Sequence, residues 1–205
     1  MQRRTFCLAL GAAVLAGALP ALAAETPQAF VLRVSEDILS AIKADARIKA
    51  GDKQAISALV DKKMMPVVDF VRMTRMAVGP KWREATDAQK TTMQDLFRQI
   101  LINVYSGALT MVTDHKAKIL PHGQETATDA IVKSALVPST GQDVKVDYRL
   151  KLDKAGVWKV TDVNVEGVWL VSNYRSQFGP VAQSSGVAGL IEQMRKRVQE
   201  TKKAK

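Results

Sequence analysis

Hydrophobic positions recur at helical spacing through the first half of the chain. Thr26-Pro27 predicts the start of the first helix, because proline is favoured at the first helical position, and apolar residues follow at three- and four-residue intervals over residues 30–42. Gly51-Asp52 separates this helix from a short second one. Residues 69–78 predict a third short helix, which Gly79-Pro80 should end.

The longest predicted helix follows this third one. Thr86 and Gln89 match the T-x-x-Q capping box, in which each residue satisfies a free backbone N–H of the first turn. From residue 93 to residue 112, apolar side chains keep a 3.6-residue spacing. The apolar side of this helix is wide, so we expect the helix to be buried along its length against a large apolar surface.

The second half of the chain changes to strand patterns. Residues 142–153 alternate apolar and polar side chains, and residues 127–137, 157–165 and a shorter stretch near 117–121 also predict strands. The short turns between them favour an antiparallel sheet. Helices return from about residue 171, and Gly179-Pro180 should bend or stop the first of them. The order predicts one α+β domain with helices packed on one face of a curved antiparallel sheet of about four strands.

The N-terminus has the three parts of a secretory signal peptide. Arg3 and Arg4 precede an apolar run over residues 6–19, and Ala21-Leu22-Ala23 follows as an A-x-A cleavage signal. The run is too short to span a bilayer. We therefore expect residues 1–23 to be a signal peptide and residues 24–205 to be the single mature domain. The RRTF stretch partly matches a twin-arginine signal, so general secretion and twin-arginine export both remain open.

Export removes much of the chemistry that the chain might otherwise use. Cys7 is the only cysteine and leaves with the signal peptide, so the mature chain has no disulfide and no thiol nucleophile. The mature chain keeps 28 basic and 20 acidic residues, and 28 − 20 = +8. Such a charge suits anionic lipid or acidic protein partners, whereas export argues against nucleic acid.

Catalytic and metal-binding patterns are weak. His115 and His122 lack neighbouring ligands at metal-binding spacing, and we expect both at the surface. Asp162 and Glu166 are four residues apart in a predicted strand, which places them about 13 Å apart, too far for a cooperating acid and base. Catalysis is therefore the weaker interpretation, and we expect neither an enzyme nor a cofactor.

Two long motifs resemble the MlaC-like periplasmic phospholipid-binding proteins, also called toluene-tolerance auxiliary proteins. The first is a D-F-x-R-M-x-R-x-x-x-G segment, followed by a tryptophan and a Thr-capped long helix that ends near Tyr-x-x-x-L. The second is W-K-V-x-D-V-x-V-E-G-x-x-L-V-x-N-Y-R-x-Q-F over residues 158–178. The first motif and a closing glycine pair match Asp69, Phe70, Arg72, Met73, Arg75, Gly79, Trp82, Thr86, Tyr105, Leu109, Gly186, Gly189 and Leu190.

This resemblance implies a soluble periplasmic carrier that binds phospholipid without a cofactor. It implies two partners: an inner-membrane ABC transporter complex and an outer-membrane lipoprotein–porin complex. The shuttling would maintain outer-membrane lipid asymmetry. The implied fold is similar to nuclear-transport-factor-like folds, with helices that enclose an apolar cavity, and we expect a monomer. Three alternatives remain open: a carrier of another lipid such as a hopanoid, an envelope enzyme, and an adaptor that only bridges membrane complexes.

Candidate site residues come from the apolar faces and from the arginines of the motifs. An acyl-chain cavity needs long apolar side chains, and methionines tolerate variable chains. Taken singly, such apolar residues more often belong to an ordinary core than to a cavity wall, and such arginines are in structural ion pairs at least as often as in head-group or partner contacts. Arg72, Arg75 and Arg175 are the candidates for head-group or partner contact. The candidates for the cavity wall are Phe70, Met73, Phe97, Leu101, Tyr105, Val146, Tyr148, Leu150, Val163, Val165, Tyr174 and Phe178.

Overall fold

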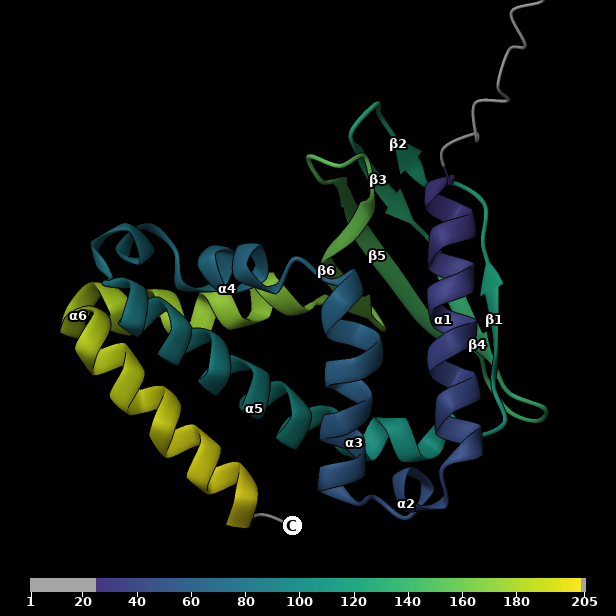
Figure 1. The fold of residues 1–205 in the computed structure, drawn as a ribbon, viewed down its shortest axis with the longest axis horizontal. Helices are drawn as coiled ribbons and strands as arrows, with labels where there is room; N and C mark the ends of the chain where they lie inside the picture. The colour runs from purple at the N-terminus through teal and green to yellow at the C-terminus, as the bar shows by residue number, and fades with distance from the viewer. Residues whose placement is uncertain (1–24, 204–205) are drawn as a thin grey trace, which may run out of the picture.

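The computed structural model describes residues 25–203, so the expected signal peptide lies outside the described residues. Within that range, no helix has both the length and the hydropathy needed to cross a bilayer. A group of helices lies beside a curled sheet, and α1 crosses the sheet (Figure 1). The helical elements are α1 Pro27–Ala44, α2 Ala46–Lys49, α3 Lys53–Leu59, the π-helical turn η1 Val60–Met64, the 3-10 turns η2 Met65–Val67 and η3 Pro80–Glu84, α4 Phe70–Val78, α5 Asp87–Met111 and α6 Leu170–Lys203.

The predicted helices of the first half are confirmed, including their start signals. Thr26 Oγ accepts a hydrogen bond from Ala29 N at 3.2 Å, which satisfies one free donor of α1. In α5 the capping box is complete, since Gln89 N donates to Thr86 Oγ at 3.2 Å and Thr86 N donates to Gln89 Oε1 at 2.9 Å. The sequence did not predict α2, a single turn that Asp45 caps.

The antiparallel sheet is confirmed. Within residues 25–203 it has seven strands where about four were predicted, because the prediction missed two short strands of two residues each and the break within residues 127–137. Its order is β1-β4-β5-β3-β2, and β6 pairs with the other edge of β5 and with β7. The strand predicted over residues 127–137 is interrupted at Lys133, and the next residue, Ser134, donates its side-chain hydroxyl to Val146 O. The strands are β1 Lys116–Ile119, β2 Gln124–Glu125, β3 Asp129–Val132, β4 Ser134–Val137, β5 Val144–Leu152, β6 Trp158–Val165 and β7 Val168–Trp169.

The last helix corrects one expectation. Gly179-Pro180 does not stop α6, which continues through Pro180 and breaks at Gly186 instead. The fixed φ of proline is compatible with a helix, and the carbonyl that loses its partner belongs to Ser176, an exposed residue that water can reach. Gly186 has φ 66° and ψ −172°, a backbone region open essentially to glycine alone. The kink therefore lies where the backbone has the freedom to turn.

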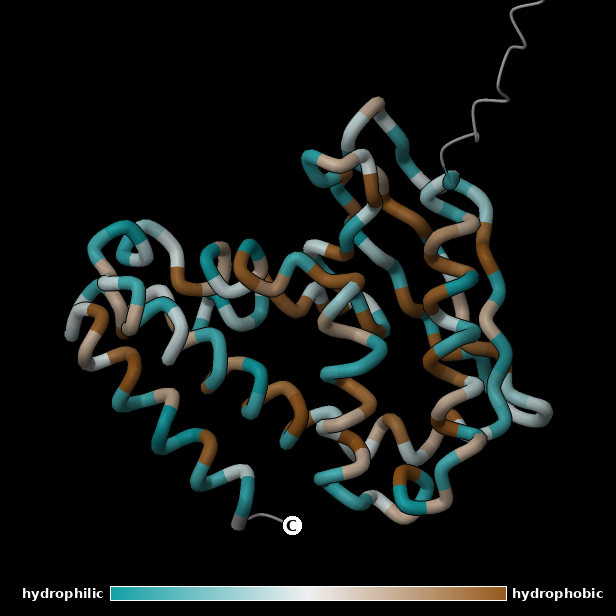
Figure 2. Tube along the Cα trace, in the orientation of Figure 1, coloured by the Kyte–Doolittle hydropathy of each residue, from teal (hydrophilic) through white to brown (hydrophobic). Residues whose placement is uncertain are grey.

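In the part of the chain that the structure describes, the buried apolar side chains form three clusters instead of one continuous core. The first joins α4, α5 and α6, the second joins α1 to the sheet, and the third joins the end of α1 to α2 and α3. In Figure 2, hydrophobic and hydrophilic positions alternate around α1, α5 and α6, as expected for helices that bury only one side. The separation of the clusters leaves room between the sheet and the helices.

Tyr174 gives the first cluster a measurable pH dependence. Its side chain is 1% exposed, and burial raises its pKa to about 12, because the phenolate would lose its hydration. An unfolded tyrosine titrates near pH 10, so this contribution to stability is complete below about pH 10 and is lost as the pH rises through about 12. Urea unfolding from pH 8 to 12 should show Tyr174→Phe losing about 2–3 kcal/mol less stability than the wild type. Equal alkaline losses in both proteins would contradict this assignment.

Candidate functional site

A cavity of about 310 Å³ lies between the sheet and the helices α3, α4 and α5. Its wall is almost entirely apolar, and three methionines, Met64, Met65 and Met73, contribute to it. Ligand pockets for apolar molecules have this composition, with few polar groups. The full wall consists of Ile56, Val60, Met64, Met65, Val68, Phe70, Met73, Arg98, Leu101, Ile102, Tyr105, Ser106, Ala108, Leu109, Val112, Leu136, Val144, Val146, Val163, Val165 and Leu170.

The alternation of the strands explains the sheet side of the wall. Val146 pairs with Val165 across β5 and β6, and both side chains line the cavity together with Val163. Asp147, the next residue after Val146 on β5, points to the opposite face of the sheet, because successive strand side chains alternate. On the helix side, Leu101 and Tyr105 are four residues apart on α5 and share one side of the helix.

The wall side chains differ from core side chains in their burial. Phe97 and Ile100 on α5 are completely buried, whereas Leu101 and Tyr105 on the same helix are only partly buried. Val165 and most other wall residues are also partly exposed despite being apolar. Protein interiors are normally close-packed, so a concave apolar surface that stays partly exposed is the expected form of a site for an apolar ligand.

The structure divides the predicted cavity residues into two groups. Those on the cavity wall are Phe70, Met73, Leu101, Tyr105, Val146, Val163 and Val165. Those away from the wall are Phe97, Tyr148, Leu150, Tyr174 and Phe178, which lie in the packed clusters or against them.

Two kinds of packing account for the residues away from the wall. The ring of Phe97 contacts Tyr174 at a centroid distance of 4.9 Å and Phe178 at 5.5 Å, which fills the space between α5 and α6. Tyr148 and Leu150 lie beneath α1, where the Tyr148 hydroxyl is 3.4 Å from Ser35 Oγ. These side chains shape the fold around the cavity without forming its surface.

Sequence reasoning missed the contribution of α3, η1 and η2. Their wall residues belong to short segments around Pro66, where the helical period is broken and gives no clear face. On α5 a usable signal was present, because the apolar stripe is wider than one packed face requires. One side of that stripe, with Phe97 and Ile100, packs on α6, and the other side, with Leu101, Tyr105 and Leu109, faces the cavity.

None of the three candidate arginines lines the apolar cavity. Arg175 donates from Nη1 to Met76 O at 2.9 Å and passes so close to Gly79 that a Cβ there would lie 2.6 Å from its guanidinium carbon. This close approach, together with φ +85°, explains the glycine of the motif. Arg75 is exposed, and Arg72 borders a different hollow.

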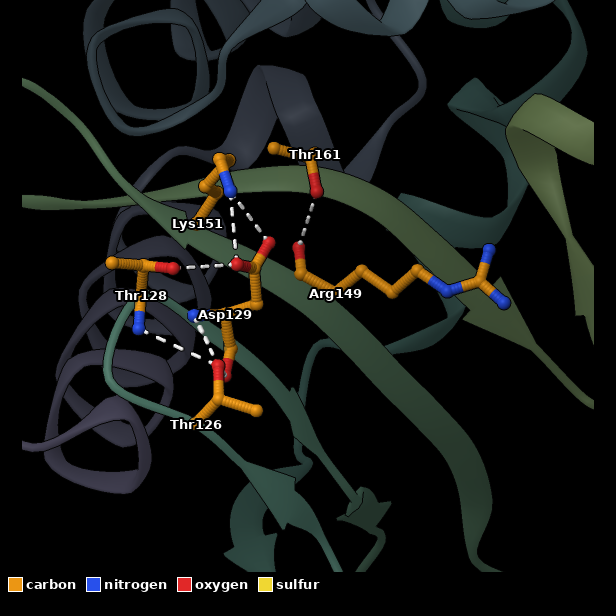
Figure 3. Close-up of polar contacts among 6 residues, drawn as sticks. All are labelled: Thr126, Thr128, Asp129, Arg149, Lys151 and Thr161. Atoms are coloured by element: carbon orange, nitrogen blue, oxygen red, sulfur yellow. Dashed lines mark hydrogen bonds and ion pairs between the residues drawn. The ribbon is translucent and has the colours of Figure 1, made fainter.

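That second hollow, also about 310 Å³, has a wall of mixed polar and apolar residues and lies between α4 and strands β2, β3, β5 and β6. Figure 3 shows Lys151 Nζ donating to both carboxylate oxygens of Asp129, at 2.9 Å each, and the Thr128 hydroxyl donating to the same carboxylate. Arg149 pairs with Asp162 at 3.1 Å and lies over the Trp169 ring at 3.9 Å. Three charged groups of this hollow, Asp129, Arg149 and Asp162, are thus held in ion pairs, as on a polar sheet surface.

The weak catalytic candidates have structural roles. Asp162 Oδ1 accepts from Val163 N and Val171 N, both at 2.9 Å, and so caps the start of α6, while Glu166 accepts from Lys145 N. His115 is not at the surface as expected, because it is 8% exposed, with Nδ1 2.9 Å from Asp114. Across residues 25–203 no cluster of three His, Asp or Glu side chains has metal-site geometry.

Comparison with known proteins gives concordant matches. The model of the MlaC protein family matches residues 32–196. The toluene tolerance protein Ttg2D of Pseudomonas putida is 28% identical over 179 residues, which cover 86% of this chain and 83% of that protein. The three-dimensional structure of the phospholipid-binding protein from Ralstonia solanacearum, in complex with a phospholipid, superimposes with a TM-score of 0.80 and 36% identity. That match covers 85% of this chain and 97% of the other.

Proposed function

We propose, from the premise that this chain belongs to the MlaC family, that it binds phospholipid in the apolar cavity and carries it between membranes. The family consists of lipid-binding carriers and not of enzymes. The similar protein from Ralstonia solanacearum was determined with a phospholipid bound. The observation that carries the proposal is the partly exposed apolar wall between the sheet and α3, α4 and α5.

The energetics favour such a cavity. A diacyl lipid has roughly 30 methylenes, and exposing them to water would cost on the order of 24 kcal/mol at about 0.8 kcal/mol each. A cavity of about 310 Å³ is at the small end of ligand pockets, which span roughly 300–1,000 Å³. Loading therefore requires the walls to open further. Met64, Met65 and Met73 are suited to this, because methionine repacks around different shapes.

The cellular setting is part of the proposal. Family members are periplasmic, and the N-terminal pattern of this chain is that of a cleaved signal peptide. We place the carrier in the periplasm, where it would receive or deliver phospholipid at an inner-membrane ABC transporter complex and an outer-membrane lipoprotein–porin complex. In this setting its transport would maintain outer-membrane lipid asymmetry.

Lipid recovery from the protein tests the proposal. The full chain is expressed in a Gram-negative host, purified from the periplasm and analysed by native mass spectrometry and by extraction with thin-layer chromatography. We expect phospholipid at a fixed stoichiometry. An unrelated basic exported protein, purified in parallel, controls for lipid carried over from membranes. Repeated recovery of empty protein would contradict the proposal and favour the adaptor, whereas recovery of a hopanoid would replace the phospholipid as the ligand.

A further inference from the structure

One charged side chain interrupts the apolar wall of the cavity. Among the described residues that line it, Arg98 of α5 alone carries a formal charge. Its side chain is 20% exposed and pairs with Asp61, whose side chain is 59% exposed. The edge of the cavity at Arg98 therefore reaches water, while the wall beyond it is apolar. Acyl chains buried in the wall would place the polar end of their lipid at such an edge.

The hydrogen bonds of the Arg98 guanidinium to other described residues all come from one nitrogen, Nη2. Nη2 donates to Ser57 Oγ at 2.9 Å, to Ser57 O at 3.4 Å and to Asp61. Nε is buried and has no hydrogen-bond partner among the described residues. A buried donor without an acceptor destabilises the folded state, so its presence in a folded protein requires an explanation. Arg72 and Arg197 also have an unpartnered Nε, but neither lines the apolar cavity.

We infer that Arg98 binds the phosphate of the lipid head group. The inference rests on the proposed function, because it names the part of the phospholipid that this edge of the cavity would hold. The guanidinium has five donors in a planar fork that matches two phosphate oxygens, and its charge is present at every physiological pH. The unpartnered Nε is the donor that a phosphate oxygen would satisfy.

Asp61 competes with the phosphate for this guanidinium. It belongs to η1, a single π-helical turn that also supplies Val60 and Met64 to the cavity wall. Such turns are rare and occur often at functional sites. The Asp61 carboxylate neutralises Arg98, and the phosphate of a bound lipid would take its place. Exchange of one anion for the other would couple loading to a movement of η1.

The test compares two lipids with identical tails in delipidated protein. Dioleoylphosphatidylglycerol carries a phosphate and dioleoylglycerol carries none, so their affinity ratio measures phosphate recognition. We expect the wild type to prefer the phospholipid and Arg98→Met to lose about tenfold or more of this preference, because charge-assisted hydrogen bonds are lost. Arg98→Lys should fall between the two, and Asp61→Asn should raise the preference. Arg195→Met, at an exposed arginine of α6, is the control and should leave the ratio unchanged.

Arg98→Met should lower the preference for the phospholipid and Asp61→Asn should raise it. These opposite directions separate phosphate recognition from misfolding, since a damaged fold would not raise the preference. If Arg98→Met weakens both lipids equally or neither, the Arg98 inference is overturned while the proposed function stands. If the wild type binds neither lipid, both are overturned. A further arm titrates inorganic phosphate alone. Phosphate binding that depends on Arg98, combined with an unchanged lipid preference, would assign the site to a free anion and overturn the head-group inference.

Discussion

Val165→Asp should abolish the recovery of phospholipid with the purified protein while leaving the fold intact. Val165 ends β6, lines the cavity and is only partly buried, so an empty cavity leaves room for water around the new carboxylate. Bound acyl tails would displace that water, and the desolvation of the introduced carboxylate costs several kcal/mol. A penalty of about 3 kcal/mol weakens binding about 100-fold. The measurement is the ratio of phospholipid to protein after periplasmic purification.

A matched pair of variants makes this result interpretable. Val168→Asp makes the same substitution in the neighbouring β7, at a valine that is 51% exposed and does not line the cavity, and it should retain lipid. Val165→Trp fills the cavity without adding charge and should also exclude lipid. Circular dichroism and thermal unfolding check that all three variants remain folded. Full lipid recovery with both Val165 variants would show that the lipid binds elsewhere.

The elements of the fold with local signals were predictable. The capping box of Thr86 and Gln89 located the start of α5 to the residue, and the alternation around Val146 gave both faces of β5. These signals work because capping and side-chain alternation depend on neighbours within a few residues. The sequence predicted the break of α6 at Pro180, but the break lies at Gly186. The position of a helix break depends on where the chain must turn to pack against the rest of the protein. Sequence alone does not specify that position.

The site was predictable only in part, for a different reason. A periodic stripe identifies the apolar side of an element, but it does not say whether that side meets another side chain or an empty space. Phe97 and Leu101 on α5 are both apolar and four residues apart, and the sequence gives both the same weight. One is enclosed by the rings of Phe70, Tyr174 and Phe178, and the other borders the cavity. Arg98 was missed because neither family motif specifies an arginine at its position. In addition, nothing in its local sequence marks a cavity edge.

Phe97→Ala should therefore mainly reduce stability, whereas Leu101→Ala should mainly reduce lipid binding. Phe97 is 0% exposed and its ring contacts three other aromatic rings, so its truncation leaves a hole in the packed cluster. Such a substitution typically costs about 3–5 kcal/mol, a large share of the total stability of a domain. Leu101 is already partly exposed to the cavity, so Leu101→Ala should cost only about 1–2 kcal/mol. It removes a side chain from the proposed contact surface of the acyl chains and should weaken lipid binding.

Both free energies of unfolding have to be measured by urea titration on delipidated protein, because bound lipid would stabilise the native state and hide the difference. Lipid binding is then compared at a temperature where both variants are folded. Under those conditions Phe97→Ala should bind phospholipid nearly as the wild type does, since Phe97 does not reach the cavity. If Leu101→Ala were instead as destabilising as Phe97→Ala, Leu101 would belong to the packed core, and α5 would have one buried face where the structure has a core face and a cavity face.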